Sequence, residues 1–303
     1  MPTTIEHLEP RVYLSLTMAD CMVLCPYIVP GDRDGDNVVG LDDFVDLKQA
    51  GPDDVLEHFE AMKLHWGDPF GIPITANPVG AGTYTELGAP LFVDEQTADD
   101  WRQGNVGDCY GIAAAASVVH ADPWFFSRTM ADLGDGTFIG HWVYVSGEIT
   151  VFRMTTDLLV NSSGGLIYAT LTPDGESYAA LWEKMFAEAR YGAGSYASID
   201  RGWPDGVYRG LGLDSYSDWV WNYTDLPSHL ESVLANGGAV TLVSQTTNVG
   251  PIVANHVYAV TDVIRDPAGE IVGIELYNPW GNYLSITIPQ LLAGFRLVTE
   301  VAT

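Results

Sequence analysis

The residues around Cys109 could turn a cysteine into a nucleophile. The thiol follows a glycine-containing run at 103–108 and precedes an alanine-rich stretch at 111–116. Glycines favour a turn, Asp108 is a suitable N-cap and alanines favour a helix, so Cys109 is predicted to lie in the first turn of a helix. The free N–H groups and the dipole at that end stabilise a thiolate, which predicts a lowered thiol pKa. Gln103 is close enough in the chain to donate its amide N–H to a developing oxyanion.

A histidine and an asparagine later in the chain could complete this chemistry. His256 follows Cys109 within the interval of about 130–150 residues that separates these two residues in papain-like enzymes, and Asn278 comes after it. Apolar segments at 256–263 and 271–277 flank a turn with Pro and Gly, a pattern that predicts a β-hairpin. An antiparallel hairpin brings its two ends together, so His256 and Asn278 are expected to meet as a base and its orienting amide.

Further elements are expected around these residues. Strands are predicted at 137–143 and 147–152, with a turn between them. A helix is predicted at 227–235, ending before two glycines, and a strand follows it at 239–243. The chain therefore mixes helices and strands, with the candidate cysteine on a helix and the candidate histidine among strands.

Taken in order, these motifs resemble the calpain family of papain-fold cysteine proteases. The resemblance covers residues 88–303 and rests on five segments, which are QGNVGDCY at 103–110, LWEKMFA at 181–187, NHVYAV at 255–260, NPWG at 278–281 and IPQLLAGF at 288–295. It implies an α+β fold of two lobes with the cleft between them. The cysteine would lie on a helical lobe, and the histidine and asparagine on an antiparallel β lobe.

The resemblance also implies a role for each candidate residue. Cys109 would be the nucleophile, His256 the general base and then acid, and Asn278 the group that holds the imidazole. Trp280 would shield that pair from water, and Gln103 would complete the oxyanion hole. The implied reaction is hydrolysis of peptide bonds through an acyl-enzyme, with polypeptides as substrates and no cofactor needed for the chemistry.

Two positions depart from the family pattern, and other interpretations of the same residues stay open. Tyr110 stands in place of the tryptophan usual in animal members, and Asn255 in place of the glycine that often precedes the histidine. A free cysteine is also often a buried apolar residue, and a histidine before a strand is often structural. The alternatives are a catalytically inactive, calcium-binding surface or docking protein, and a transglutaminase-like acyltransferase, a class that usually has aspartate as its third residue.

A second candidate site lies at residues 32–43, DRDGDNVVGLDD, which matches a calcium loop of EF-hand type. Asn37 occupies the position that normally requires glycine, and asparagine is the next best residue for a left-handed backbone. Asp43 in place of glutamate resembles the calcium repeat of dockerin modules, which could bind a docking partner. The alternative is an acidic, solvated turn. The expected Ca²⁺ ligands are Asp32, Asp34, Asp36, the carbonyl of Val38, and Asp43.

Composition limits the remaining functions. A net charge of −27 excludes a general binder of nucleic acids or of anionic membrane surfaces, which carry negative phosphates. Three cysteines are too few for a disulfide framework, and Cys21 and Cys25 could be paired or free. The sequence has no run of apolar residues long enough for a transmembrane helix.

These features predict a leader-like segment at 1–30, a calcium module at 31–62, a Gly/Pro-rich linker at 63–87 and a catalytic domain at 88–303. The first segment resembles a leader motif of some exported bacterial proteins, although it lacks a clear signal-peptide apolar region. An extracellular or cell-surface location is therefore favoured over an intracellular one.

Overall fold

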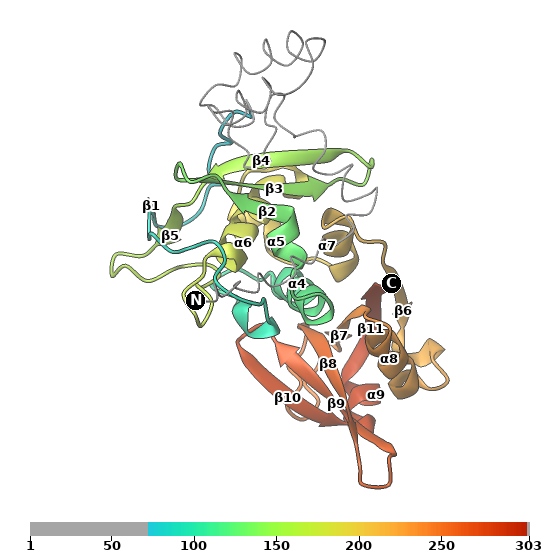
Figure 1. Cartoon of the computed structure of the whole chain (residues 1–303). Coiled ribbons are helices and arrows are strands. Elements are labelled where there is room, and N and C mark those ends of the chain that lie inside the picture. Colours follow the sequence, from blue (N-terminus) through green and yellow to red (C-terminus); the bar gives the residue numbers. More distant parts are fainter. Residues whose placement is uncertain (1–71, 302–303) are drawn as a thin grey trace, which may run out of the picture. The chain divides into compact units, whose positions relative to one another are not determined.

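The computed structural model describes residues 72–301 (Figure 1). All but the first of them belong to one compact unit, Pro73–Thr303. The predicted leader, the calcium loop with its ligands Asp32, Asp34, Asp36, Val38 and Asp43, and the cysteines Cys21 and Cys25 lie outside the described residues.

The described residues form a mixed α/β fold. Its helices are α4 (Cys109–Ala121), α5 (Phe125–Thr129), α6 (Tyr178–Ala189), α7 (Pro204–Gly210), α8 (Leu226–Ala235) and α9 (Ile288–Gly294). Its strands are β1 (Thr83–Thr85), β2 (Met130–Asp132), β3 (Thr137–Val143), β4 (Ile149–Thr155), β5 (Leu158–Val160), β6 (Tyr216–Trp219), β7 (Ala239–Ser244), β8 (Val257–Arg265), β9 (Ile271–Asn278), β10 (Asn282–Thr287) and β11 (Phe295–Val301). Single turns of 3₁₀ helix occur at Ala98–Asp100, Arg190–Gly192, Tyr196–Ile199 and Val220–Asn222.

The C-terminal half of this unit is built on an antiparallel sheet in the order β10-β9-β8-β7-β11-β6 (Figure 1). The predicted hairpin is confirmed as β8 and β9, whose register sets Ala259 opposite Tyr277. The predicted helix at 227–235 and strand at 239–243 are confirmed as α8 and β7. Leu230 of α8 and Leu291 of α9 join Leu276 of β9 in one buried cluster, so these helices cover apolar parts of the sheet.

Helix α4 occupies the centre of the other half and is buried on every side. Its residues from Tyr110 to Val119 are all buried. This agrees with its sequence, which has no polar face along the helix. Gly111 lies against the ring of Phe186 on α6, where a Cβ would be too close. On its other sides α4 contacts α7, β7 and β8. Small side chains thus let the helix that begins with Cys109 come close to the sheet that carries His256.

A smaller antiparallel sheet, β2-β3-β4, lies beside α5 and α6 (Figure 1). Strand β3 matches the prediction for 137–143, whereas β4 begins at Ile149, later than the predicted residue 147. The reason is that Gly147 has a φ of 83° and closes a turn by donating its N–H to the carbonyl of Tyr144 (2.8 Å).

Irregular chain precedes the first helix and is hydrogen-bonded to the same unit. The N–H of Thr75 donates to the carbonyl of Arg153 (2.7 Å), and that of Val79 to the carbonyl of Gly194 (2.7 Å). Strand β1 pairs with β5. The part of the predicted linker that the structure describes is therefore attached along its length. None of the helices between residues 72 and 301 is both long and apolar enough to cross a bilayer.

Candidate active site

A cavity of about 770 Å³ lies where the start of α4 faces the start of β8. Cys109, Gln103, His256 and Trp280 all line it. Asn278, the fifth candidate, is buried and contacts His256 through its side chain. The structure therefore brings together residues that are far apart in the sequence.

The loop before Cys109 needs its two glycines because the chain passes close to other backbone and side-chain atoms. A Cβ at Gly104 would overlap the carbonyl oxygen of Tyr168, and one at Gly107 would overlap the carboxylate of Asp200. The Gly107 N–H donates to that carboxylate (3.2 Å). The glycine spacing thus reflects close packing that holds the start of α4 in place.

Two hydrogen bonds join this loop to the end of strand β9. The backbone N–H of Gln103 donates to the carbonyl of Pro279 (2.8 Å), and the hydroxyl of Tyr277 donates to the carbonyl of Trp101 (2.9 Å). Pro279 follows Asn278 directly, so the loop that carries the nucleophile candidate is tied to the turn that carries the orienting amide.

The backbone of His256 is fixed by strand β7. Its N–H donates to Oγ of Ser244 (2.8 Å), and the Ser244 N–H donates to the His256 carbonyl (2.9 Å). The preceding residue, Asn255, has a φ of 52°, in the left-handed region. Asparagine tolerates this conformation better than most residues with a Cβ, which explains how it can stand where glycine often precedes the histidine.

The surroundings of Asn278 determine which nitrogen of His256 carries the proton. The Trp280 N–H donates to Oδ1 of Asn278 (3.1 Å), and Nδ2 of Asn278 donates to Asn282 (3.2 Å), so Oδ1 is an acceptor. Nε2 of His256, 2.8 Å from Oδ1, must then be the donor. Nδ1 is left with the lone pair and can accept a proton. The Trp280 ring lies 4.6 Å from the imidazole, centroid to centroid, and covers it.

The Gln103 side chain lies in the same cavity and is held by the loop itself. Its Nε2 donates to the carbonyl of Val106 (2.5 Å). An amide nitrogen carries two N–H groups, so one stays available for another acceptor.

The pKa of the Cys109 thiol moves in the direction opposite to the sequence prediction. Burial, with smaller contributions from the carboxylates of Asp108 and Asp200, raises this pKa to about 12. Backbone N–H groups of Val257 and of Cys109 itself lower it, but burial outweighs them. Burial also lowers the pKa of His256, partly offset by the hydrogen bond to Asn278. The thiol and the imidazole are therefore both neutral near pH 7 in this state.

Asp108 occupies the predicted N-cap position, but its side chain does not cap the helix. Its carbonyl accepts from the N–H groups of Gly111 (2.7 Å) and Ile112 (3.1 Å), whereas neither carboxylate oxygen has such a donor among the described residues. The carboxyl group is instead fully buried beside Glu183 of α6.

Burial raises the pKa of Asp108 to about 7 and raises the pKa of Glu183 well above its usual range. Two carboxylates this close cannot both be ionised at low cost, so at least one of the pair keeps its proton near neutral pH. The pair was not predicted from the sequence. The available signal was the pair of charged residues Glu183 and Lys184 within the apolar residues of 181–187.

The described residues contain no cluster of three or more His, Cys, Asp or Glu side chains arranged to hold a metal ion. The arrangement around Cys109 can supply a nucleophile, a base and N–H donors.

Comparisons with known proteins point to one family. The family model described as Calpain family cysteine protease matches residues 83–285. Calpain-B of Drosophila melanogaster is 27% identical over 213 residues, which are 63% of this chain and 22% of that protein. Calpain clp-1 of Caenorhabditis elegans is 25% identical over 211 residues, 63% of this chain and 26% of that protein. The Calpain-1 catalytic subunit of Bos taurus is 26% identical over 219 residues, which are 63% of this chain and 28% of that protein. The chain thus matches about a quarter of the length of these curated relatives.

Proposed function

The chain belongs to the calpain family of cysteine proteases, and from this we propose that it is an endopeptidase acting through Cys109, His256 and Asn278. One observation supports the proposal above all. Cys109 and His256 line one cavity, while Asn278 accepts from Nε2 of His256 and leaves Nδ1 as the base. The placement of α4 against β8 also supports a papain-like fold of two lobes.

In the proposed mechanism, Nδ1 of His256 takes the thiol proton as Sγ of Cys109 attacks the peptide carbonyl carbon. The carbonyl oxygen becomes an oxyanion near the N–H of Cys109 and the free N–H of Gln103. The imidazolium then gives its proton to the leaving amine, and the C–N bond breaks to leave a thioester. Water, deprotonated by His256, hydrolyses the thioester and releases the acid, restoring the thiol.

Because the Cys109 thiol and the His256 imidazole are both neutral before substrate binds, the proton moves from Sγ to Nδ1 during the attack on the substrate. The burial that raises the thiol pKa also strengthens the interaction of any developing charge with the N–H groups at the start of α4. Trp280 would contribute by keeping water from the His256–Asn278 hydrogen bond, for which its ring is already in position.

The test is to measure cleavage of an unstructured protein such as casein by wild type and by Cys109→Ala. We expect the variant to lose activity by several orders of magnitude, because residues 72–301 contain no other thiol that could form the thioester. Its melting temperature should stay close to that of wild type, since alanine is accepted at the start of a helix. Activity retained by Cys109→Ala would overturn the assignment.

The same preparation distinguishes the alternatives. A transglutaminase-like acyltransferase would incorporate a labelled amine into casein without cleaving it. An inactive docking protein would do neither, and its Cys109 would show no reactivity toward iodoacetamide.

We also propose that the loop at 32–43 binds Ca²⁺ and modulates the enzyme. Its pattern of Asp32, Asp34, Asp36, Val38 and Asp43 supports this proposal. Calorimetric titration of the full chain with Ca²⁺ should give one binding event that Asp32→Ala abolishes. Identical heats for wild type and variant would exclude the loop.

A further inference from the structure

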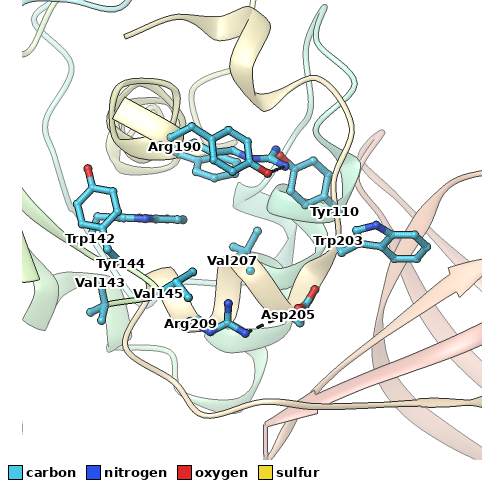
Figure 2. Close-up of a pocket in the computed structure, with 13 residues that line it drawn as sticks. Tyr110, Trp142, Val143, Tyr144, Val145, Arg190, Trp203, Asp205, Val207 and Arg209 are labelled. Atoms are coloured by element: carbon cyan, nitrogen blue, oxygen red, sulfur yellow. Dashed lines mark hydrogen bonds and ion pairs between the residues drawn. The ribbon is translucent and has the colours of Figure 1, made fainter. Parts of the chain in front are cut away.

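A second cavity, of about 300 Å³, adjoins the Cys109 cavity. Tyr110 and Trp203, both labelled in Figure 2, line both cavities, which therefore share a wall. The second cavity is enclosed by the end of α6, the end of β3 with the residues after it, and α7. Its volume is at the lower end of the range for small ligands and suits a single side chain with part of its backbone.

Aromatic rings form much of its wall. Trp142 stacks on Phe186 at 5.1 Å between ring centroids, and the hydroxyl of Tyr144 donates to the carbonyl of Ala189 (3.1 Å). Both contacts fix the rings in place before anything binds. Such a wall favours a ligand with an apolar stem.

Arg190 supplies a positive charge to this cavity. Its guanidinium carbon lies 4.8 Å from the centre of the Tyr110 ring and 4.9 Å from that of Tyr191, and Nη2 donates to the Tyr191 hydroxyl (3.2 Å). Nη1 is buried and has no hydrogen-bond partner among the described residues. A buried donor without an acceptor is costly, so this nitrogen favours a ligand that brings one.

The other charges at the cavity leave a net positive site. Arg209 and Asp205 form an ion pair across one helical turn of α7 (3.9 Å), with both side chains about half exposed. In the view of Figure 2, Arg190 and Arg209 lie on opposite sides of the cavity. The buried Asp108 carboxyl interacts with the charge of Arg190, but burial keeps its pKa at about 7, so it only partly neutralises the guanidinium near neutral pH. In a chain of net charge −27, a positive cavity beside the nucleophile is unusual.

We propose that this cavity is a specificity subsite that binds an acidic side chain of the polypeptide substrate, glutamate in particular. The methylene groups of glutamate would contact the aromatic wall, and its carboxylate would accept from Arg190, whose planar fork suits that group. This inference rests on the proposed peptidase function, because the shared wall of Tyr110 and Trp203 connects the subsite to Cys109.

The test uses peptides that place a single glutamate at successive positions around a cleavable bond in an otherwise neutral sequence, each matched with a glutamine peptide. We measure kcat/KM with wild type and equilibrium binding to Cys109→Ala. At one position, glutamate should exceed glutamine by about tenfold or more in both measurements, the size expected for a charge-assisted hydrogen bond. Equal values at every position, or a preference for glutamine, would overturn the subsite.

Two variants locate the preference. Arg190→Gln should abolish it, but Arg190 also packs against aromatic rings, so a second variant that leaves it in place is needed. Gly206 lines the cavity, and a Cβ there meets nothing within 4 Å. Gly206→Phe therefore places a ring at the exposed edge of the cavity with little cost to the fold and should weaken the preference, whereas Gly206→Ala should keep it. A preference that is undiminished in Gly206→Phe would contradict the proposal.

A remote control and the two readouts separate this inference from the proposed function. Arg265 forms an ion pair with Glu231, and neither residue lines the cavity. Arg265→Gln removes one positive charge elsewhere on the protein, so it should leave the glutamate preference intact. Cleavage without any glutamate preference would overturn the subsite alone. A binding preference without cleavage would overturn the peptidase assignment alone.

Discussion

Two neighbouring residues of α6 show two ways of burying a charge. Glu183 and Lys184 are both fully buried. The Lys184 ammonium donates to the carbonyls of Thr155 and Asp157 and to the Asp157 carboxylate, each at 2.7 Å. Glu183 accepts one hydrogen bond, from the N–H of Ala169 (2.8 Å). Its other carboxyl oxygen has no hydrogen-bond partner among the described residues and lies beside the Asp108 carboxyl.

Lys184 therefore has a structural role, whereas the ionisation of Glu183 and Asp108 affects the candidate active site. Lys184 has opposite charge and acceptors on hand, so it holds α6 against the chain between β4 and β5 whatever happens at Cys109. Glu183 and Asp108 carry like charge, and their contact survives only with a proton. Because Asp108 directly precedes the nucleophile candidate, the proton count of this pair influences the thiol.

The largest expected effect tests the Lys184 side of the comparison. Lys184→Met should lower the free energy of unfolding by about 3–5 kcal/mol, because Asp157 loses its buried partner. Urea denaturation measures this loss. The exposed pair of Arg265 and Glu231 provides the matched control, since Arg265→Gln should cost at most about 1 kcal/mol. Equal midpoints for Lys184→Met and wild type would show that the ion pair contributes nothing.

A smaller effect tests the proton kept by the pair of Glu183 and Asp108. Above about pH 4 an unfolded carboxyl loses its proton, whereas folded Asp108 keeps its proton up to its raised pKa of about 7. Glu183, whose pKa is raised well above its usual range, keeps its proton as well, so the folded state binds more protons than the unfolded state and the pair's contribution to stability falls as pH rises from about 4 through 7 and beyond. In Glu183→Gln an amide can donate to ionised Asp108 without a carboxyl proton, so this fall should shrink.

Urea midpoints at pH 5 and pH 8 for both proteins provide the comparison. Other groups titrate equally in the two, so the difference in slope isolates the pair. Identical pH dependence in wild type and Glu183→Gln would show that the pair does not keep an extra proton.

The smallest effect concerns the thiol itself. The Asp108 carboxylate raises the pKa of Cys109, so Asp108→Asn should lower that pKa and increase the thiolate present at a given pH. The rate of alkylation by iodoacetamide at pH 8 should rise a few-fold, while Asp99→Asn, a carboxylate that does not act on the thiol pKa, should leave it unchanged. An unchanged rate in Asp108→Asn would mean that the carboxyl is already neutral at that pH and does not act on the thiol.

The parts of the site that the sequence could predict depend on local pattern. The hairpin of β8 and β9 follows from two apolar runs around a turn, and it alone brings His256 to Asn278. Helix α4 follows from a turn, a cap position and alanines. The remaining features depend on segments that meet only in three dimensions. No pattern near Asp108 indicates that Glu183 lies beside it, and burial of Cys109 by β8 reverses the pKa expected from the helix end alone.

The contact of α4 with β7 and β8 also has a consequence for the order of synthesis. A ribosome makes Cys109 and its alanine-rich helix long before it makes β8, so one side of that helix stays uncovered in the nascent chain. The thiol meets His256 only after nearly the whole unit has emerged. Under the proposed mechanism, the nascent chain therefore holds Cys109 without its catalytic base, and activity begins only when β8 and β9 have folded beside α4.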